Sequence, residues 1–74
     1  MKLKELNPKY NAIEALPTRR RDGNDFAYTM QNMELLKLKE AVKKYGDCEV
    51  LSIRDYDETK TTSVILLVGE EENE

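Results

Sequence analysis

The clearest pattern of hydrophobic and polar positions is an apolar run at 62–68, which reads Thr-Ser-Val-Ile-Leu-Leu-Val. Successive side chains of a β-strand point to opposite faces of its sheet. One face of the predicted strand therefore carries Val64, Leu66 and Val68, and the other carries Ile65 and Leu67. A single helix covers only one face of a sheet, so an apolar second face needs another layer or another molecule.

The same pattern predicts a C-terminal β-hairpin. Residues 48–56 are rich in Val, Leu and Ile, and a polar turn at 57–60 separates them from a strand at 62–69. Two apolar segments joined by a short polar turn are typical of a hairpin. In the first strand, Leu51 and Ile53 share one face, whereas the other face mixes apolar and polar side chains.

A central helix is predicted at 33–45, where apolar residues recur with the helical period at Leu35, Leu38, Val42 and Tyr45. Asn32 is suited to cap the first turn, and Gly46 is suited to the left-handed residue that ends a helix. Met33 and Leu36 lie off the main apolar stripe. They contact either the N-terminal segment or a partner protein.

The first 31 residues give a weaker pattern. Segments at 12–20 and 25–30 have strand character and flank an Asp-Gly turn signal, so we expect either a second hairpin or an irregular wrap. Pro17 lacks a backbone N–H, which favours an edge position for the first strand. The predicted fold is one α+β domain at 1–69, with an antiparallel sheet in ββαββ order and a disordered acidic tail at 70–74.

Composition excludes several kinds of chemistry. The 74 residues include one cysteine, Cys48, and no histidine. An internal disulfide, a structural zinc site and histidine-dependent nucleophiles are therefore excluded. The first residues are charged and no stretch reaches about 18 apolar residues, which predicts a soluble cytoplasmic protein without a membrane span. We predict no catalytic residue, no cofactor, no metal and no small-molecule substrate.

Charge is distributed unequally along the chain. Residues 1–21 hold six basic and two acidic residues, whereas residues 47–74 hold two basic and nine acidic residues. Such asymmetry either steers a charged partner or lets the two ends attract each other within one fold.

The segment Asp55-Tyr56-Asp57-Glu58-Thr59 has the form D-x-D-x-T and follows an apolar strand. It resembles the first motif of haloacid-dehalogenase-type phosphatases. In that family the first Asp attacks phosphorus, the second Asp acts as an acid/base, and both help to hold Mg²⁺. That family also needs a parallel α/β sheet, a later lysine and further acidic ligands, for which 74 residues leave no room. Asp and Thr are common in turns, so we interpret the segment as the hairpin turn, whose carboxylates also suit weak Mg²⁺ or Ca²⁺ binding.

The acidic hairpin also suggests a decoy. Asp55, Asp57 and Glu58 can occupy a groove that is built for phosphates, as acidic proteins of phages and mobile elements do. The twelve residues at 56–67 resemble a hairpin in phage inhibitors of uracil-DNA glycosylase. That resemblance implies inhibition of a nucleic-acid-binding enzyme, such as a host defence nuclease. Solubility is the simpler role for these acids.

The basic patch Arg19, Arg20 and Arg21 could grip phosphates. Adjacent residues of a strand face opposite sides, however, so the three do not form one surface. The patch has no interleaved aromatic residues for base stacking, so we interpret it first as a solvated hairpin end, next as a contact for an acidic partner, and last as a nucleic-acid site.

The favoured function is a small non-catalytic interaction module. It either self-associates as a homodimer or binds a partner protein through an apolar sheet and helix surface. The residues predicted to form that surface are Met33, Leu36, Val64, Leu66 and Val68. The acidic decoy is the first alternative, and a nucleic-acid-binding module that uses the basic N-terminal segment is the second.

Overall fold

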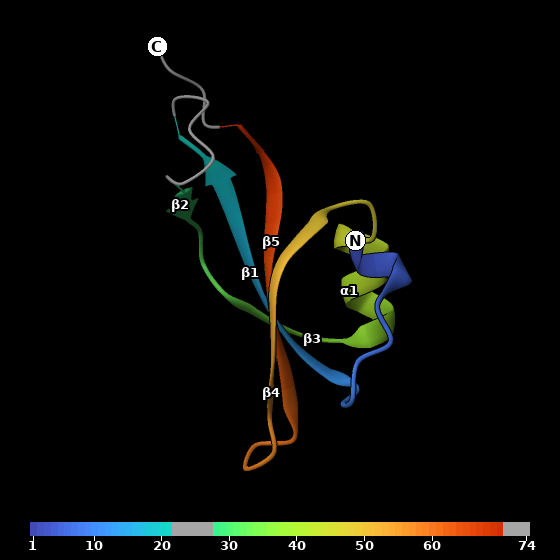
Figure 1. The fold of residues 1–74 in the computed structure, drawn as a ribbon. Helices are drawn as coiled ribbons and strands as arrows, with labels where there is room; N and C mark the ends of the chain where they lie inside the picture. Colours follow the sequence, from blue (N-terminus) through green and yellow to red (C-terminus); the bar gives the residue numbers. More distant parts are fainter. Residues whose placement is uncertain (22–27, 71–74) are drawn as a thin grey trace.

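The computed structural model describes residues 1–21 and 28–70. Its elements follow in the order η1 (Leu3–Glu5), β1 (Ala12–Arg20), β2 (Tyr28–Met30), β3 (Glu34–Lys37), α1 (Leu38–Tyr45), β4 (Glu49–Tyr56) and β5 (Thr61–Glu70) (Figure 1). The fold is α+β, as predicted, with one α-helix and a five-stranded sheet among the described residues.

The sheet is mixed rather than antiparallel. Its strands lie in the order β2-β1-β5-β4, and β3 also pairs with β1. β1 and β5 run parallel, whereas the pairs β1–β2, β1–β3 and β4–β5 are antiparallel. The predicted ββαββ order and all-antiparallel sheet are therefore wrong. A parallel pair forms because β2, β3, α1 and β4 lie between the two strands along the chain and return it to the same end of the sheet.

Both predicted hairpins are present where the structure describes them. β4 and β5 pair across the turn at 57–60, in which Lys60 takes a left-handed φ of 55°. β1 and β2 pair antiparallel as well. Residues 25–27 of the predicted strand and residues 71–74 of the predicted tail lie outside the described residues, and Glu70 is the last residue of β5.

The predicted helix at 33–45 is correct only in its second half. Residues Glu34–Lys37 form β3, and α1 begins at Leu38. β3 pairs with β1, where Leu36 lies opposite Ile13 and packs against the core. Backbone pairing together with burial of Leu36 therefore outweighs the helical period of the sequence.

Pro17 lies in a central strand rather than at the edge that the sequence favours. β1 has β5 on one side and both β2 and β3 on the other. The Pro17 carbonyl accepts a hydrogen bond of 2.9 Å from the backbone N–H of Gln31, which lies between β2 and β3. Because the N–H and C=O of one strand residue point to the same side, the missing N–H of Pro17 faces this break in the pairing. The sheet tolerates the proline because no partner strand needs a donor there.

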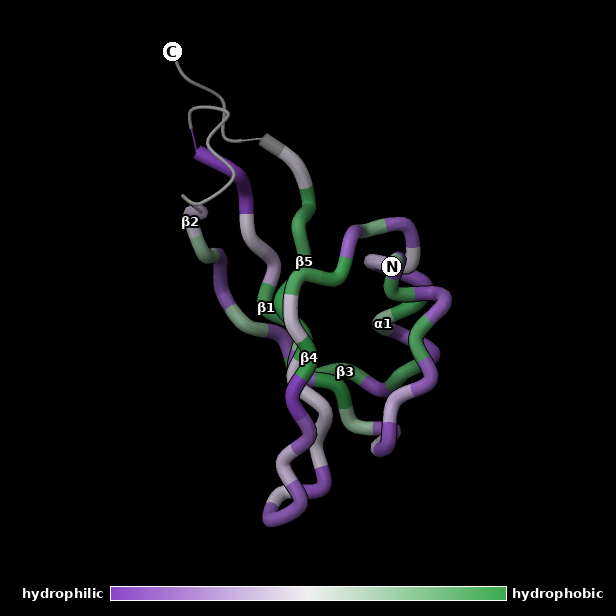
Figure 2. Tube along the Cα trace, in the orientation of Figure 1, coloured by the Kyte–Doolittle hydropathy of each residue, from purple (hydrophilic) through white to green (hydrophobic). Residues whose placement is uncertain are grey.

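Helix α1 and η1 pack on one face of the sheet, here called the inner face (Figure 1). Six hydrophobic side chains are fully buried there: Leu3, Ile13, Ala15, Ala41, Val64 and Leu66. Figure 2 shows hydrophobic segments of β1, β5 and α1 around this interior and hydrophilic segments at the tip of the β4–β5 hairpin. The chain's own helical layer therefore covers one face of the apolar run.

The unequal charge of the two ends is used within the fold. The Lys4 ammonium lies 2.9 Å from a carboxylate oxygen of Asp47, and the Lys9 ammonium lies 2.8 Å from one of Asp57. Both pairs join the basic N-terminal segment to the acidic C-terminal third. They are exposed, so each contributes little to stability, but together they position the N-terminal segment along the hairpin.

Candidate functional site

The sheet face opposite α1 and η1, here called the outer face, has no helix over it in the part of the chain that the structure describes (Figure 1). The strand registers fix which residues share it, because directly paired residues point to the same side. One row across four strands is Leu35, Glu14, Ser63 and Arg54. The next row is Leu16, Ile65 and Ser52.

Apolar side chains on and beside the outer face are strongly exposed. Leu35 is 67% exposed, Met33 55% and Tyr56 41%. Ile65 is half-buried, whereas its neighbours Val64 and Leu66 on the inner face are 0% exposed. The second apolar face of the run at 62–68 is therefore the one that the described chain leaves partly uncovered.

The outer face is hollowed beside the hairpin turn. The largest of three adjoining hollows on this face has a volume of about 490 Å³ and is lined by Glu14, Asp55, Tyr56, Asp57, Glu58, Thr59 and Ser63. None of these residues is basic, and Glu14, Asp57 and Glu58 bring carboxylates to the lining, whereas Asp55 pairs in register with buried Thr62 on the inner-face side and accepts its hydroxyl proton. An exposed cavity with this lining attracts positive charge.

Two smaller hollows continue the largest one across the sheet. One of about 270 Å³ adjoins it at Glu14 and Thr59, and reaches the apolar side chains of Met33 and Leu35. The other, of about 260 Å³, lies towards β4 and is lined by Ser52, Arg54, Tyr56, Ser63 and Ile65. These three adjoining hollows are here called the outer groove; its β3 end is apolar, whereas its β4 end combines Arg54 and two serines with Tyr56 and Ile65.

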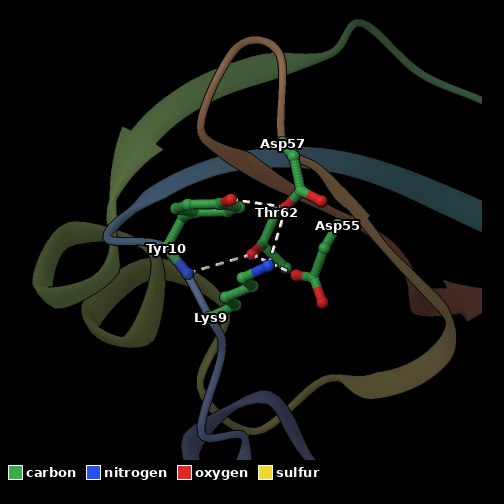
Figure 3. Close-up of polar contacts among 5 residues, drawn as sticks. All are labelled: Lys9, Tyr10, Asp55, Asp57 and Thr62. Atoms are coloured by element: carbon green, nitrogen blue, oxygen red, sulfur yellow. Dashed lines mark hydrogen bonds and ion pairs between the residues drawn. The ribbon is translucent and has the colours of Figure 1, made fainter.

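The N-terminal segment holds the acidic turn in place (Figure 3). Asp57 accepts hydrogen bonds from the Lys9 ammonium, at 2.8 Å, and from the Tyr10 hydroxyl. Thr62, which is fully buried, donates its hydroxyl proton to Asp55 at 2.7 Å and accepts the backbone N–H of Tyr10 at 3.3 Å. Asp57 and Thr62 are therefore held by residues about fifty positions away along the chain, and Thr62 in turn orients Asp55 across the hairpin.

These contacts change the titration of the groups involved. The hydrogen bond from Lys9, and after it the one from Tyr10, hold the pKa of Asp57 below its ordinary value. The same bond raises the pKa of Lys9, and the bond to Asp57 raises the pKa of Tyr10. The contact is therefore an ion pair at neutral pH.

Asp57→Asn is expected to make stability less dependent on acid. The pKa of Asp57 is lowered in the folded protein, so its contribution is fully present above the unfolded pKa and is lost as pH falls through the folded value, below about pH 4. Urea-unfolding midpoints measured from neutral to acidic pH should fall less steeply in the variant than in the wild type. Glu58→Gln is the matched control, because that carboxylate makes no contact with Lys9 or Tyr10, and an equal change in both variants would contradict the assignment.

The structure separates the predicted apolar surface. Met33 is exposed beside the outer groove, whereas Leu36 and Val68 are half-buried. Val64 and Leu66 are fully buried beneath α1 and η1, so a partner cannot reach them without opening the core. Only Met33 of the predicted set is a strongly exposed side chain.

The two predicted charged sets lie in different places. Asp55, Asp57 and Glu58 come together as part of the lining of the largest hollow. Arg19 and Arg20 end β1, and Arg21 follows it, at the end of the strand away from that hollow (Figure 1). Arg19 pairs in register with Gly69, and its guanidinium lies beside that glycine, where a Cβ would lie 3.4 Å from Nη1.

Sequence reasoning missed three residues of the outer groove. The sequence pattern predicts no role for Glu14, places Leu35 on the buried stripe of a helix, and places Ile65 on the second face of its strand without a neighbour. The signal that could have found Leu35 is the adjacent pair Leu35 and Leu36, whose side chains point to opposite faces if 34–37 is a strand beside 12–15.

Cys48 is packed rather than reactive. Burial raises the pKa of its thiol, and the nearby Asp47 carboxylate raises it further. A protonated thiol at neutral pH is a poor nucleophile. Among the described residues, no group of three or more acidic, histidine or cysteine side chains is arranged to hold a metal ion. Nor is any helix of the described ranges long and apolar enough to cross a membrane.

Comparison of the chain with protein-family models, with curated proteins and with solved structures finds no match. The resemblances of the short motifs at 55–59 and 56–67 therefore remain local.

Proposed function

We propose that the protein is a non-catalytic interaction module that binds a partner protein through its outer face. The observation that supports this is the contrast between the two faces of β5. The inner face is closed by α1 and η1, whereas the outer face presents Leu35, Met33 and Tyr56 beside a continuous groove. Exposed apolar side chains gathered around a groove are typical of protein-binding surfaces.

A catalytic role has less support. The chain has no histidine, and the pKa of its single thiol is raised. Asp57, which the D-x-D-x-T resemblance would make an acid/base, is held as an ion pair by Lys9. A carboxylate whose pKa is lowered in this way is a poor proton donor at neutral pH.

The double variant Leu35→Ser with Ile65→Thr tests the proposal. Tagged wild-type and variant proteins are used to capture partners from a cell extract, and recovered proteins are quantified by mass spectrometry. We expect at least one protein recovered by the wild type to be lost, by about tenfold or more, with the variant, because a central apolar contact contributes about 1–2 kcal/mol or more to binding. Sedimentation velocity of the wild type alone measures self-association in parallel.

Ile53→Ser provides the matched control. Ile53 is 43% exposed on β4 and pairs with Val64, so it lies on the inner-face side and away from the outer groove. Removing its exposed apolar surface should leave the recovered proteins unchanged. If the double variant recovers the same proteins as the wild type, or if the Ile53 control loses them equally, the outer face is not the binding surface.

A second candidate function is a decoy inhibitor of a nucleic-acid-binding enzyme. It is favoured by the projecting β4–β5 hairpin, whose turn carries exposed carboxylates (Figure 2). Reversing the charges of Asp55, Asp57 and Glu58 to lysine should then abolish inhibition of the target enzyme in a nucleic-acid cleavage assay, and unchanged inhibition would remove this candidate. Asp57 is already paired with Lys9, which weakens its resemblance to a free phosphate.

A further inference from the structure

We infer that two copies of the protein pair through the free edge of β3, as antiparallel strands with Leu35 of one copy opposite Leu35 of the other. The inference goes beyond the proposed function, because it concerns an edge of the sheet rather than a partner on its outer face. It rests on backbone groups that β3 leaves without a partner strand in the described chain, and on the exposed apolar side chains beside them.

The free edge of β3 offers hydrogen-bonding groups at the spacing of a strand. Of the described strands, β3 pairs with β1 alone. Just after β3, the N–H of Leu38 donates to the carbonyl of Asn11, which leads into β1, at 2.8 Å. Because backbone directions alternate along a strand, Leu36 also faces β1, whereas Leu35 and Lys37 direct their N–H and C=O away from it. An extended backbone is the ligand that satisfies such donors and acceptors.

The other long edge of the sheet is blunted in ways that oppose strand addition. β4 has a register shift between Val50 and Ser52, and the Met1 carbonyl already accepts the backbone N–H of Val50 at 2.8 Å. β3 has no proline, and its pairing with β1 has no register shift. Its Leu35 is the most exposed large hydrophobic side chain among the described residues. β3 is therefore the edge of this sheet that is suited to a further strand.

A second copy fits this edge because β3 is complementary to itself. Pairing about Leu35 sets Lys37 of one copy opposite Met33 of the other, so no like charges face each other there. Glu34 lies on the inner-face side, where it is already paired with Lys44 of its own chain. Leu35 and Met33, which are 67% and 55% exposed, would then lie beside their counterparts across the two-fold axis.

This register joins the two sheets into one. Directly opposed residues of an antiparallel pair point to the same side, so the two outer faces form one continuous surface and both helices lie on the other side. A register centred on Leu36 is disfavoured, because it would place Leu38, the first residue of α1, opposite Glu34 of the second copy. The dimer therefore presents two outer faces side by side.

Sedimentation velocity at concentrations from about 1 μM to about 1 mM tests the pairing, and we expect the wild type to dimerise within this range. Leu35→Pro keeps an apolar side chain but removes the outward N–H, which an edge strand tolerates. Leu35→Ala keeps that N–H and loses most of the side chain. Proline should weaken the dimer by about tenfold or more, and more than alanine does, because the two-fold axis makes each lost hydrogen bond count twice. Ile53→Ser, exposed on β4, is the control and should dimerise as the wild type does.

Amide hydrogen exchange of the wild type gives a second measurement, which does not depend on the folding of a variant. The Leu35 amide should exchange rapidly in dilute protein and slowly where the dimer forms, whereas the Leu36 amide, which faces β1, should exchange slowly in both. A Leu35 amide that stays unprotected in the dimer, or a proline variant that pairs as well as the alanine variant, overturns the inference. A wild type that stays monomeric at about 1 mM overturns it too, but leaves the proposed function standing, because capture of a partner by the outer face is measured separately.

Discussion

Leu66→Ala is expected to unfold most of the protein at room temperature. Leu66 is fully buried in the centre of the sheet, between Pro17 of β1 and Val50 of β4 in the strand registers. Removing a buried leucine side chain costs about 2–5 kcal/mol, through lost transfer free energy and the cavity left behind. A single core of this size supplies only about 3–5 kcal/mol of net stability. The loss is therefore comparable with the whole free energy of unfolding.

Leu67→Ala is the matched control for this prediction. Leu67 is the same residue type one position along β5, but it points to the outer face and is half-buried. Chemical unfolding followed by circular dichroism should show a markedly smaller loss for Leu67→Ala. Equal losses would mean that the outer face is as closed as the inner one, which would contradict the assignment of the two faces.

Gly46→Ala is expected to destabilise the protein by about 1–3 kcal/mol, because it forces extra volume into a packed position. A Cβ at Gly46 would lie 2.4 Å from the carbonyl oxygen of Val42. This is a steric clash, and backbone atoms would have to move to remove it. The Gly46 carbonyl also accepts the backbone N–H of Lys4 at 3.0 Å. Movement at Gly46 would therefore disturb the docking of η1 as well as the end of α1.

Asparagine at the same position separates two explanations. The sequence indicates a left-handed residue at Gly46, where asparagine would be tolerated better than alanine. In the structure Gly46 has φ −55° and ψ −32°, which is right-handed. Gly46→Asn should therefore be as destabilising as Gly46→Ala in thermal unfolding. Lys43→Ala, at the exposed surface of the helix, is the control and should leave the unfolding temperature nearly unchanged. A clearly milder effect of asparagine would restore the left-handed interpretation.

The parts of the fold that could be predicted from the sequence are those specified by local pattern. The run at 62–69 and the strand at 48–56 are adjacent in the chain and joined by a turn, so their pairing needs no long-range information. The helical signal at 38–45 is local in the same way. The parallel pairing of β1 with β5 has no local signature, because it depends on how three intervening strands and a helix pack.

β3 illustrates why the candidate site was only partly predictable. The spacing of Leu35 and Leu38 fits a helix, but Leu36 gains more by pairing with Ile13 in the sheet. Once 34–37 is a strand, Leu35 turns outward beside Glu14, and the outer groove appears. The acidic residues of the turn were visible in the sequence, whereas their apolar and acidic neighbours in the groove come from strands far away along the chain.

The parallel pair β1–β5 also constrains when the protein can fold during its synthesis. Residues that pair there are about 49 positions apart, as in Ala12 opposite Thr61. The central strand of the sheet therefore waits for the last strand to leave the ribosome, and until then Ile13 and Ala15 have no parallel neighbour. Closing so large a loop is slow compared with forming local hairpins and helices. Tertiary structure should therefore begin to form only after β5 has been synthesised, and until then the growing chain stays open to chaperones.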